Sequence, residues 1–419
     1  MNNDFLPRRG SRPGMHSQTP VYHNSSTTDK SDSFKTPDAV AAADERTPEV
    51  HGNGAVTSHH GPNKKGLKQR LRELTKKQWA IIIVVAVLLL GLIGYGVYAL
   101  VLKDDPKPAP KAATKKAETP APKPVPLVST LTGLPIADAA LNERPVTAIM
   151  IENSVDARPQ SGLNDAGVVF EAVAEGGITR FLTLWQDTDS EYIGPVRSVR
   201  PYYVQWLKGF DAPVAHAGGS NDALRLIKDL GVKDLDQFHN GSAYWRISDR
   251  YAPHNLYTST AKLHDLESSK GFGKSNYTGF ARKAETPNPA PTARTIDFNI
   301  SGALYNSHYD YDQASNSYLR SEGGSPHKDL KSGAQIAPKV VIGLVMPQGN
   351  NGIYTTYDTI GSGKAYVFQD GVVTICNWSK TSNDSNFTFK DDSGAEVKLN
   401  PGKTWLSVVG STSRVSYKP

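Results

Sequence analysis

An uncharged apolar run at residues 79–102 constrains this chain more than any other feature of its sequence. At about 1.5 Å of rise per residue, a helix of this length spans a hydrocarbon core of roughly 30 Å. A buried core helix is the alternative, but no charged residue interrupts the run. The sequence therefore predicts a single transmembrane helix that separates a short N-terminal arm from a large C-terminal region.

Basic residues on either side of this run indicate its orientation. The run begins too late in the chain, and is too long, for a cleaved signal peptide, so we expect an uncleaved signal-anchor. Basic residues gather on the cytoplasmic side of membrane helices, which favours a cytoplasmic N-terminus and an extracytoplasmic C-terminal region at 103–419. The contrast is modest, because lysines lie on both sides: Lys64, Lys65, Lys68, Arg70, Arg72, Lys76 and Lys77 come before the run, and Lys103, Lys107, Lys111, Lys115 and Lys116 come after it.

The segments around the run have the composition of unfolded chain. Residues 1–63 are rich in small and polar residues and bury too little apolar surface to fold, so a disordered cytoplasmic arm is expected. A basic juxtamembrane segment follows at 64–78. Residues 103–126 are rich in Lys, Pro and Ala, which predicts an extended, semi-rigid linker. The net charge of +6 comes largely from these flanks, so no nucleic-acid partner is expected.

The single cysteine, Cys376, excludes an intramolecular disulfide and a multi-cysteine metal site. It lies in the apolar run VVTICNW, which indicates a buried core thiol rather than a nucleophile. No metal and no cofactor are expected.

The remaining residues predict an α+β fold in two parts. A composition break at 283–294 suggests a linker between an N-terminal domain at 127–282 and a C-terminal domain at 295–419. The N-terminal domain has the pattern of a mixed α/β lobe, and the C-terminal domain that of a mostly β lobe such as a small sandwich or barrel. Strands are expected at 146–152, 168–174, 181–186, 212–217, 339–345, 365–369, 371–376, 396–399 and 404–409, and helices at 202–208 and 221–230.

The segment HAGGS at 216–220 leads from a predicted strand into a predicted helix with Ser220 as its N-cap. Gly218 and Gly219 let the main chain approach a ligand, and unpaired N–H groups at such a turn favour an anion. His216 could add a donor. An ordinary tight turn with a core histidine explains the same pattern, and the spacing matches no dinucleotide or Walker motif.

Arginines are the second group of candidate ligand-binding residues. Arg197 and Arg200 lie three residues apart, and paired guanidinium groups suit phosphate or carboxylate. Internal glutamates would serve equally well as their partners. The full candidate set for an anionic ligand is Arg158, Arg180, Arg197, Arg200, His216, Gly218, Gly219, Ser220 and Asn255; Arg246 lies in the same later loop cluster as Asn255.

Three glutamates are candidates for acid–base chemistry. Glu171 and Glu175 share one face of a strand or helix, and Glu152 ends a predicted strand. His216 or His254 could assist them. No serine–histidine–acid signature, catalytic cysteine motif or HExxH motif supports an enzyme, so catalytic residues stay unassigned.

Several long motifs resemble those of the YerB-like family of bacterial envelope lipoproteins, which carry a paired domain of unknown function. The resemblance covers about residues 126–419 and implies a two-part fold in an extracytoplasmic position, but transfers no catalytic residue. This chain has an apolar span where the family's lipidated cysteine is expected. The motifs are PLVSTLTGLPI, RPVTAIMIENS, ARPQSGL, EAVAEGGITRF, GPVRSVRPYYV, HAGGS, APHNLYTS, SPHKDLKSGAQIAPKVVIGLV, GSGKAYVFQDG and VKLNPGKTWLSVV.

Two function classes follow from the sequence. The first is a membrane-anchored binding or scaffold module for an anionic envelope component: a lipid-linked sugar phosphate, a wall polymer, or a glycan or peptide that bears carboxylates. The second is a hydrolase or transferase that acts on an envelope glycan. A structural partner of other membrane proteins is a further alternative.

Overall fold

The computed structural model describes residues 75–101 and 126–419, which belong to two separate compact units, 1–116 and 117–419. The predictions for the arm at 1–63, for most of the basic segment and for the linker up to residue 125 lie outside the described residues.

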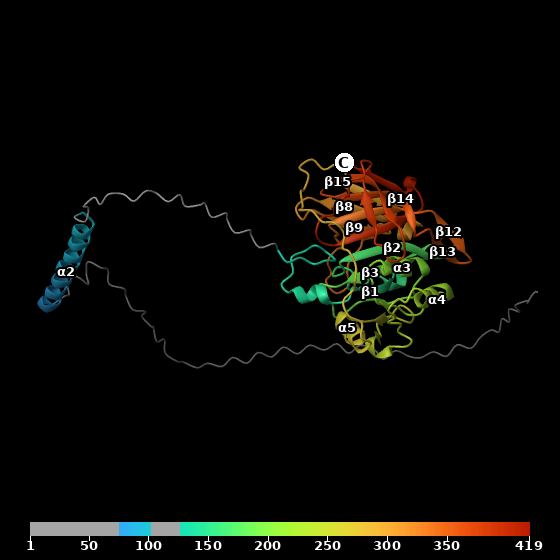
Figure 1. The fold of residues 1–419 in the computed structure, drawn as a ribbon, viewed down its shortest axis with the longest axis horizontal. Coiled ribbons are helices and arrows are strands. Elements are labelled where there is room, and N and C mark those ends of the chain that lie inside the picture. The colour runs from blue at the N-terminus through green and yellow to red at the C-terminus, as the bar shows by residue number, and fades with distance from the viewer. Residues whose placement is uncertain (1–74, 102–125) are drawn as a thin grey trace, which may run out of the picture. The chain divides into compact units, whose positions relative to one another are not determined.

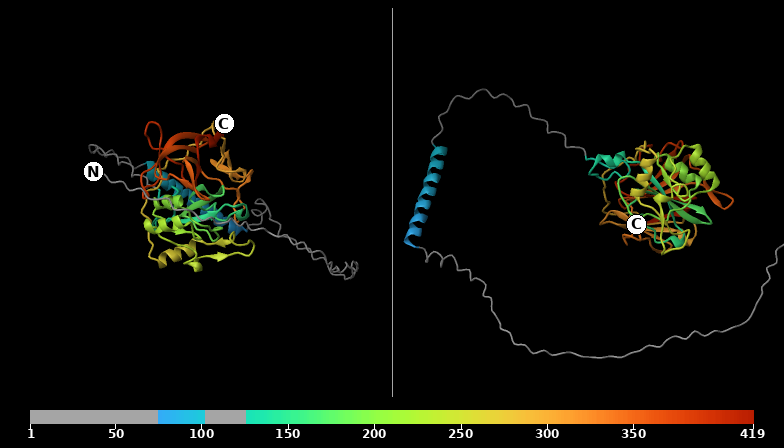
Figure 2. Two further views of the ribbon diagram at one scale, coloured as in Figure 1. Left: turned by 90° about the vertical axis from the view of Figure 1, so that its right-hand side faces the viewer. Right: turned by 90° about the horizontal axis from the view of Figure 1, so that it is seen from below.

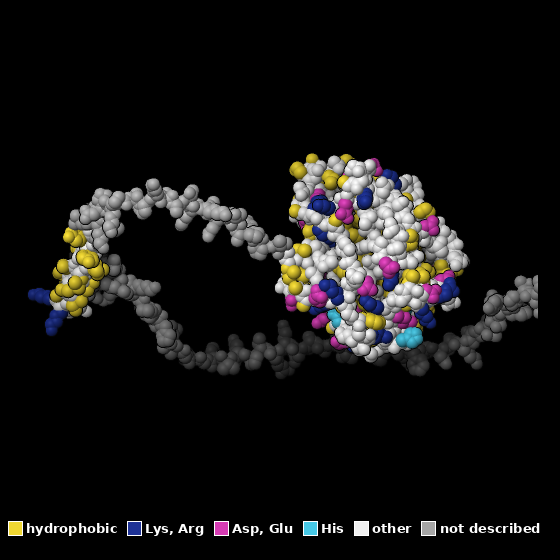
Figure 3. All heavy atoms as spheres, viewed as in Figure 1, with side chains coloured by type: hydrophobic (Ala, Val, Ile, Leu, Met, Phe, Trp, Pro, Cys, Tyr) yellow, Lys and Arg dark blue, Asp and Glu magenta, His cyan; other side chains and the backbone are white. Residues whose placement is uncertain are grey.

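Helix α2 (Lys76–Val101) covers the apolar run, of which Leu102 lies outside the described residues. Its side chains from Lys76 to Tyr98 are all exposed. Figure 3 shows a hydrophobic surface along the helix with basic side chains at one end. Within the described part of the chain, α2 is the one helix that is long and apolar enough to cross a membrane.

An eleven-stranded sheet forms the centre of residues 126–419 (Figure 1). Its main path runs in the order β16-β15-β14-β11-β17-β2-β3-β1-β4, and β13 joins β2 and carries β12. Strand β17 pairs in parallel with both β11 and β2, so both predicted domains contribute strands to one sheet. The strands are β1 (Thr147–Glu152), β2 (Val168–Glu175), β3 (Ile178–Trp185), β4 (Val214–Ala215), β11 (Val340–Val345), β12 (Gln348–Asn351), β13 (Tyr354–Tyr357), β14 (Gly361–Gln369), β15 (Val372–Lys380), β16 (Thr388–Lys390) and β17 (Thr404–Val409).

A second sheet has five strands in the order β10-β9-β8-β7-β18. These are β7 (Thr295–Phe298), β8 (Ser307–Asp312), β9 (Ser317–Glu322), β10 (Ser325–Pro326) and β18 (Val415–Lys418). The other elements are α3 (Pro201–Lys208), α4 (Asn221–Asp229), α5 (Thr260–Ser269), the small hairpin of β5 (Trp245–Arg246) and β6 (Leu256–Tyr257), and short 3-10 turns at Ala139–Glu143, Val155–Ala157, Gly241–Ala243, Ala303–Tyr305 and Thr412–Arg414.

Both faces of the middle strands of the central sheet, β1, β2, β3, β11 and β17, are buried. Side chains alternate along each strand, so Ala148 and Met150 of β1 point to one face and Ile149 and Ile151 to the other. Helices α3 and α4 cover the first face, and the second sheet with α5 covers the other. In both views of Figure 2, the N-terminal part of the domain (green) adjoins its C-terminal part (orange and red). Strands buried on both faces explain why the sequence shows continuous apolar runs there.

The α+β prediction is confirmed, and most expected strands and helices lie within a few residues of their predicted positions. The strand expected at 396–399 is wrong. Glu396 and Leu399 make only isolated bridges, because the Asp391 side chain accepts N–H bonds from Ser393 and Ala395 and turns the chain just before them. The strands of 295–419 form no separate sandwich or barrel; they are shared between the two sheets.

The expected linker at 283–294 lies against the folded structure. The N–H groups of Lys283, Thr292 and Arg294 donate to the carbonyls of Leu399, Gly371 and Lys418. Cys376 is buried as expected, and burial raises the pKa of its thiol to about 11.

Strand directions determine where a ligand can meet this sheet. Strands β1, β2, β4, β11 and β17 are mutually parallel, directly or through β3, so their carboxyl ends share one edge. Ligands of α/β sheets bind at such carboxyl ends. The loops that follow β1 and β4 are therefore where a site is expected.

The start of the domain packs closely on residues 279–282. A Cβ at Gly279 would overlap the carbonyl oxygen of Thr130, and Arg282 donates 2.6 Å to the carbonyl of Leu131. We expect Gly279→Ala to lower the free energy of unfolding by about 1–3 kcal/mol, as overpacking does. Gly273→Ala is the matched control, because nothing lies within 4 Å of its added Cβ. Thermal unfolding of both variants measures the difference, and equal midpoints would contradict this packing.

Candidate functional site

A cavity of about 530 Å³ opens at the carboxyl ends of β1 and β4. Its wall comes from the segments at 196–198, 217–219 and 236–239, together with Arg246, Pro253 and Leu256. Leu224 of α4 completes the lining.

Backbone pairing fixes the two inner segments of this wall. The N–H of Arg197 donates to Met150 at the end of β1, and the N–H of Ala217 donates to Arg197. Val199 and Gly219 form a parallel bridge next to them. Residues 196–199 therefore lie between the end of β1 and the segment that follows β4.

The cavity lining carries two arginines, one histidine and one carboxylate, that of Asp236. Arg246 Nη1 donates 2.7 Å to Asn255 Oδ1, and Arg246 has no carboxylate partner among the described residues. Asn255 in turn donates to the carbonyls of Ile247 and Arg250, so it holds the loop that carries Arg246. Arg197 Nε lies 3.2 Å from Glu152 Oε1. His239 is largely exposed at the same wall.

The turn at Gly218 and Gly219 lines the cavity, but the N–H of Gly218 already has a hydrogen-bond acceptor within the chain. The N–H of Gly218 donates 3.0 Å to Asp236 Oδ1, which also accepts the N–H of Phe238. The expected anion site on this amide is therefore filled by the chain's own carboxylate. Ser220 is the N-cap of α4, as predicted, and accepts the N–H of Ala223.

His216 lies beneath the turn and is fully buried. Its Nδ1 is 2.8 Å from the carbonyl of Gly218, and its Nε2 is 3.0 Å from Asp234 Oδ1. Burial raises the pKa of Asp234, but the hydrogen bond and charge of His216 outweigh burial and lower it below its ordinary value. His216 thus supports the turn rather than lining the cavity.

Glu152 and His254 form a pair beside the cavity. His254 Nδ1 is 3.0 Å from Glu152 Oε1, and Ser154 Oγ donates to the same oxygen at 3.0 Å. Because a carboxylate only accepts, His254 must donate from Nδ1, which leaves its Nε2 for another partner. Asp156 Oδ2 lies 3.9 Å from that nitrogen. Ser154 and Glu152 both face Nδ1, which differs from the arrangement of a catalytic triad.

Glu175 binds two of the candidate arginines. Its Oε1 accepts from Arg180 Nη2 at 2.8 Å and from Arg200 Nη2 at 2.7 Å, and its Oε2 accepts from Arg200 Nε at 2.9 Å. Burial raises the pKa of Glu175, but the two guanidinium groups outweigh it and lower the pKa below its ordinary value. Arg200 also lies over the ring of Tyr354, so these charges hold β2 to the hairpin of β12 and β13.

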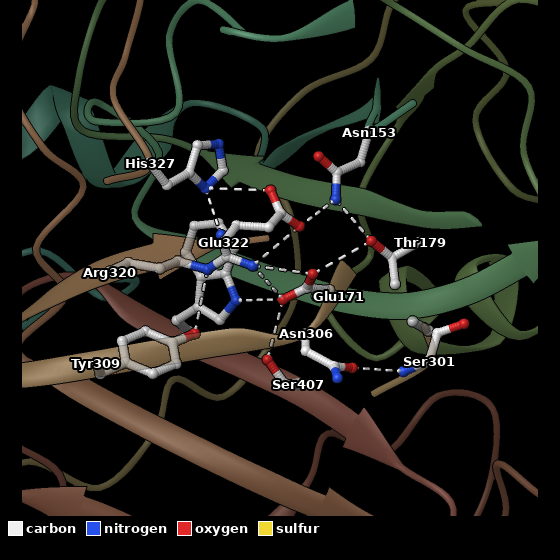
Figure 4. Close-up of polar contacts among 12 residues, drawn as sticks. Asn153, Glu171, Thr179, Ser301, Asn306, Tyr309, Arg320, Glu322, His327 and Ser407 are labelled. Atoms are coloured by element: carbon white, nitrogen blue, oxygen red, sulfur yellow. Dashed lines mark hydrogen bonds and ion pairs between the residues drawn. The ribbon is translucent and has the colours of Figure 1, made fainter. Parts of the chain in front are cut away.

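Glu171 lies at the centre of a buried network (Figure 4). Arg320 Nη2 donates to both of its carboxylate oxygens, at 3.0 and 2.9 Å, and neither side chain is exposed. Trp405 Nε1 and Ser407 Oγ each donate to Glu171 Oε2 at 3.1 Å. Burial lowers the pKa of Arg320, but the carboxylates of Glu171 and Glu322 outweigh it and raise the pKa above its ordinary value.

The network continues through neutral groups. His327 Nδ1 accepts from Arg320, so its Nε2 donates to Gln160, 2.9 Å away. Burial lowers the pKa of His327 far below its ordinary value, with Arg320 adding to the effect, so the ring is neutral. Gln160 donates to Asn153, which donates 2.6 Å to Glu322. Burial raises the pKa of Glu322 despite its neighbouring arginines.

Arg158 attaches to the same network from the surface side. Its guanidinium donates to Asn153 and to the carbonyl of Leu304, lies 3.4 Å from Glu322 and covers the ring of Tyr305. It therefore holds the loop after β1 to the second sheet. Glu171, Glu175, Arg158, Arg180 and Arg200 are all paired inside the chain, and none of them belongs to the cavity lining.

The structure brings Arg197, Gly218 and Gly219 of the candidate set to one cavity, with Asn255 behind Arg246. Asp236, Phe238 and His239 complete it and were not expected from the sequence. No local motif marks these three residues, because the bond from Gly218 to Asp236 joins positions 18 residues apart. Within residues 75–101 and 126–419, no cluster of three or more metal-ligating side chains occurs.

Comparison with known families identifies the class of protein. The N-terminal domain of the family described as "Protein of unknown function (DUF3048)" matches residues 131–273, and its C-terminal domain matches residues 296–406. The chain belongs to this YerB-like family, as its motifs predicted.

A curated relative and a solved structure that match this chain are both named YerB. The chain is 32% identical over 294 residues to the "Putative lipoprotein YerB" of Bacillus subtilis (strain 168), covering 68% of this chain and 86% of the relative. The crystal structure of YerB from Bacillus subtilis matches with a TM-score of 0.63 and 29% identity, over 70% of this chain and 100% of that chain. A relative named as a lipoprotein and an apolar helix in this chain both point to membrane association.

The buried pair yields a prediction about stability. Glu171→Gln leaves the Arg320 charge without its main counter-charge, so the free energy of unfolding should fall by roughly 3–5 kcal/mol. The double variant Glu171→Gln with Arg320→Met removes both charges and should recover part of that loss. Urea unfolding followed by tryptophan fluorescence measures both.

Arg225→Met is the control for this series. It breaks only an exposed pair with Asp222 and should leave the midpoint unchanged. A Glu171→Gln protein as stable as the wild type would show that the pair does not determine the fold.

Proposed function

We propose that this protein is a membrane-anchored extracytoplasmic binding module, and that its cavity at 196–198, 217–219 and 236–239 binds an anionic component of the cell envelope. The observation that carries the proposal is that Arg197 and Arg246, from separate segments, line one cavity. Arg158, Arg180, Arg197 and Arg200 all have an internal carboxylate partner, whereas Arg246 has none among the described residues.

The anchor in this proposal is helix α2 as a single transmembrane span. Basic residues before the span favour a cytoplasmic N-terminus and an extracytoplasmic position for residues 126–419. The relative is named as a lipoprotein, and a protein-encoded span would hold the same domain at the membrane by other means. A polymer or lipid-linked sugar of the envelope would then lie within its reach.

The chemistry of the cavity fits an anion. Guanidinium groups present several donors in a plane and bind carboxylate or phosphate with two parallel bonds. Arg246 is held in place by the neutral oxygen of Asn255, so its charge is not compensated there. Arg197 and His254 both contact Glu152, so an anionic ligand would compete with Glu152 for Arg197.

Arg246→Ala tests this proposal most directly, because the substitution removes no ion pair within the described residues. Affinity of the full chain, in lipid nanodiscs, for poly-L-glutamate and for polyphosphate should fall about tenfold, the loss of one charge-assisted contact. Arg225→Ala, on the outer side of α4, should leave both affinities unchanged. Isothermal titration at two salt concentrations measures them; equal binding by the folded Arg246→Ala protein would contradict the proposal.

A second function, hydrolysis or group transfer on an envelope glycan, is favoured by the Glu152–His254 pair. A carboxylate that orients a histidine through Nδ1 leaves Nε2 as an acid or base. Arg197 lies within 3.2 Å of the same carboxylate and also lines the cavity, so a bound anion would lie next to this pair.

If the chain is such an enzyme, His254→Gln should abolish release of reducing ends or phosphate from purified envelope glycans, while binding persists. His239→Gln is the control, because that histidine lines the cavity without contacting Glu152. Chromatography of the products measures turnover. Absence of turnover by the wild-type protein across these substrates would reject the enzymatic function and leave the binding function standing.

A further inference from the structure

We infer that the cavity recognises a sugar ring together with its anionic group, so that the ligand is an acidic glycan and not simply a polyanion. This inference rests on the proposed function and specifies its ligand. Its starting point is Phe238, which lines the cavity although 71% of its side chain is exposed.

Exposed aromatic side chains are rare in the described domain, and one of them lines this cavity. Within residues 126–419, Phe238 and Tyr251 (90% exposed) are the two exposed aromatic residues. All other Phe, Tyr and Trp residues there are partly or fully buried. Tyr251 belongs to the loop that contributes Pro253 to the lining. An aromatic ring that is exposed to water does not gain the free energy of apolar burial. A ligand that covers the ring would supply that free energy.

The turn beneath Phe238 fixes the position of its ring. A Cβ at Gly218 would lie 3.1 Å from the ring edge, so glycine lets the ring pack directly on the turn. Gly218 also has a φ of +62°, which glycine adopts without strain. The main-chain N–H of Phe238 donates to Asp236 Oδ1, which ties the backbone that carries the ring to the cavity wall.

Asp236 makes a sugar a better ligand than a nucleotide. Its Oδ1 accepts hydrogen bonds from two backbone amides, whereas its Oδ2 accepts none from the described residues and lies 3.6 Å from His239 Nδ1. A carboxylate oxygen accepts hydroxyl protons but repels phosphate. A pyranose offers an apolar face for Phe238, hydroxyl groups for Asp236 and, when acidic, a carboxylate or phosphate for Arg246 and Arg197. A stacked nucleotide offers few hydroxyl groups.

The test compares ligands that share charge but differ in rings. The full chain in nanodiscs is titrated with polygalacturonate, which has a carboxylate on each pyranose, with poly-L-glutamate, which has no rings, and with oligothymidylate, which has stacking bases. The wild type should bind polygalacturonate most tightly. Phe238→Ala should weaken that binding about tenfold and leave poly-L-glutamate binding unchanged, whereas Phe238→Trp should retain it.

Ile353→Ala is the matched control, because Ile353 is also 71% exposed but lies between β12 and β13, outside the cavity lining. It should change no affinity. If polygalacturonate and poly-L-glutamate bind equally and Phe238→Ala affects neither, the glycan inference is overturned while anion binding stands. Tightest binding of oligothymidylate overturns it in favour of a nucleotide ligand. If no polyanion binds the wild type, the proposed function fails as well.

Discussion

The ion pair between Glu171 and Arg320 is the interaction on which the rest of the structure depends. Glu171 lies on β2 in the central sheet and Arg320 on β9 in the second sheet, and both are fully buried. A charge without its partner in such a place costs several kcal/mol. Because the N-terminal domain match supplies Glu171 and the C-terminal match supplies Arg320, each part leaves a buried charge that only the other neutralises. The parallel pairing of β17 with β2 joins the same two parts, so residues 126–419 belong to one compact unit with a shared sheet.

This arrangement separates structural charges from those available to a ligand. Arg180 and Arg200 bind Glu175, and Arg158 supports Glu322, so three guanidinium groups that the sequence alone offers to a ligand are used in packing. Arg246 differs, because a neutral amide holds it and no carboxylate balances it among the described residues. The position of the cavity follows from the topology, since β1 and β4 are parallel neighbours whose carboxyl ends meet there.

Local patterns in the sequence predicted local structure well. The apolar runs of β1 and β2, the N-cap at Ser220 and the buried Cys376 depend on residues close together in the chain. Partners across the fold could not be predicted in this way. Glu171 looked like an acid–base group because nothing near it in the sequence reveals Arg320, 149 residues later. Likewise, Gly218 looked like an anion site because Asp236, which accepts its N–H, lies beyond helix α4. Burial and pairing, not residue type, decide which charges are free.

Arg197 connects the two functions proposed for this site. Its guanidinium lies against Glu152, which His254 also contacts, and it lines the cavity. An anionic ligand that draws Arg197 into the cavity would remove a positive charge from Glu152 and leave His254 as that carboxylate's main partner. The strength of the Glu152–His254 bond would then depend on whether the cavity is occupied. Binding is sufficient for a module that only holds an envelope polymer, whereas catalysis would also require His254 Nε2 to act as an acid or base. The same contact therefore permits the binding module and, where the ligand also presents a reactive bond to His254 Nε2, an enzyme.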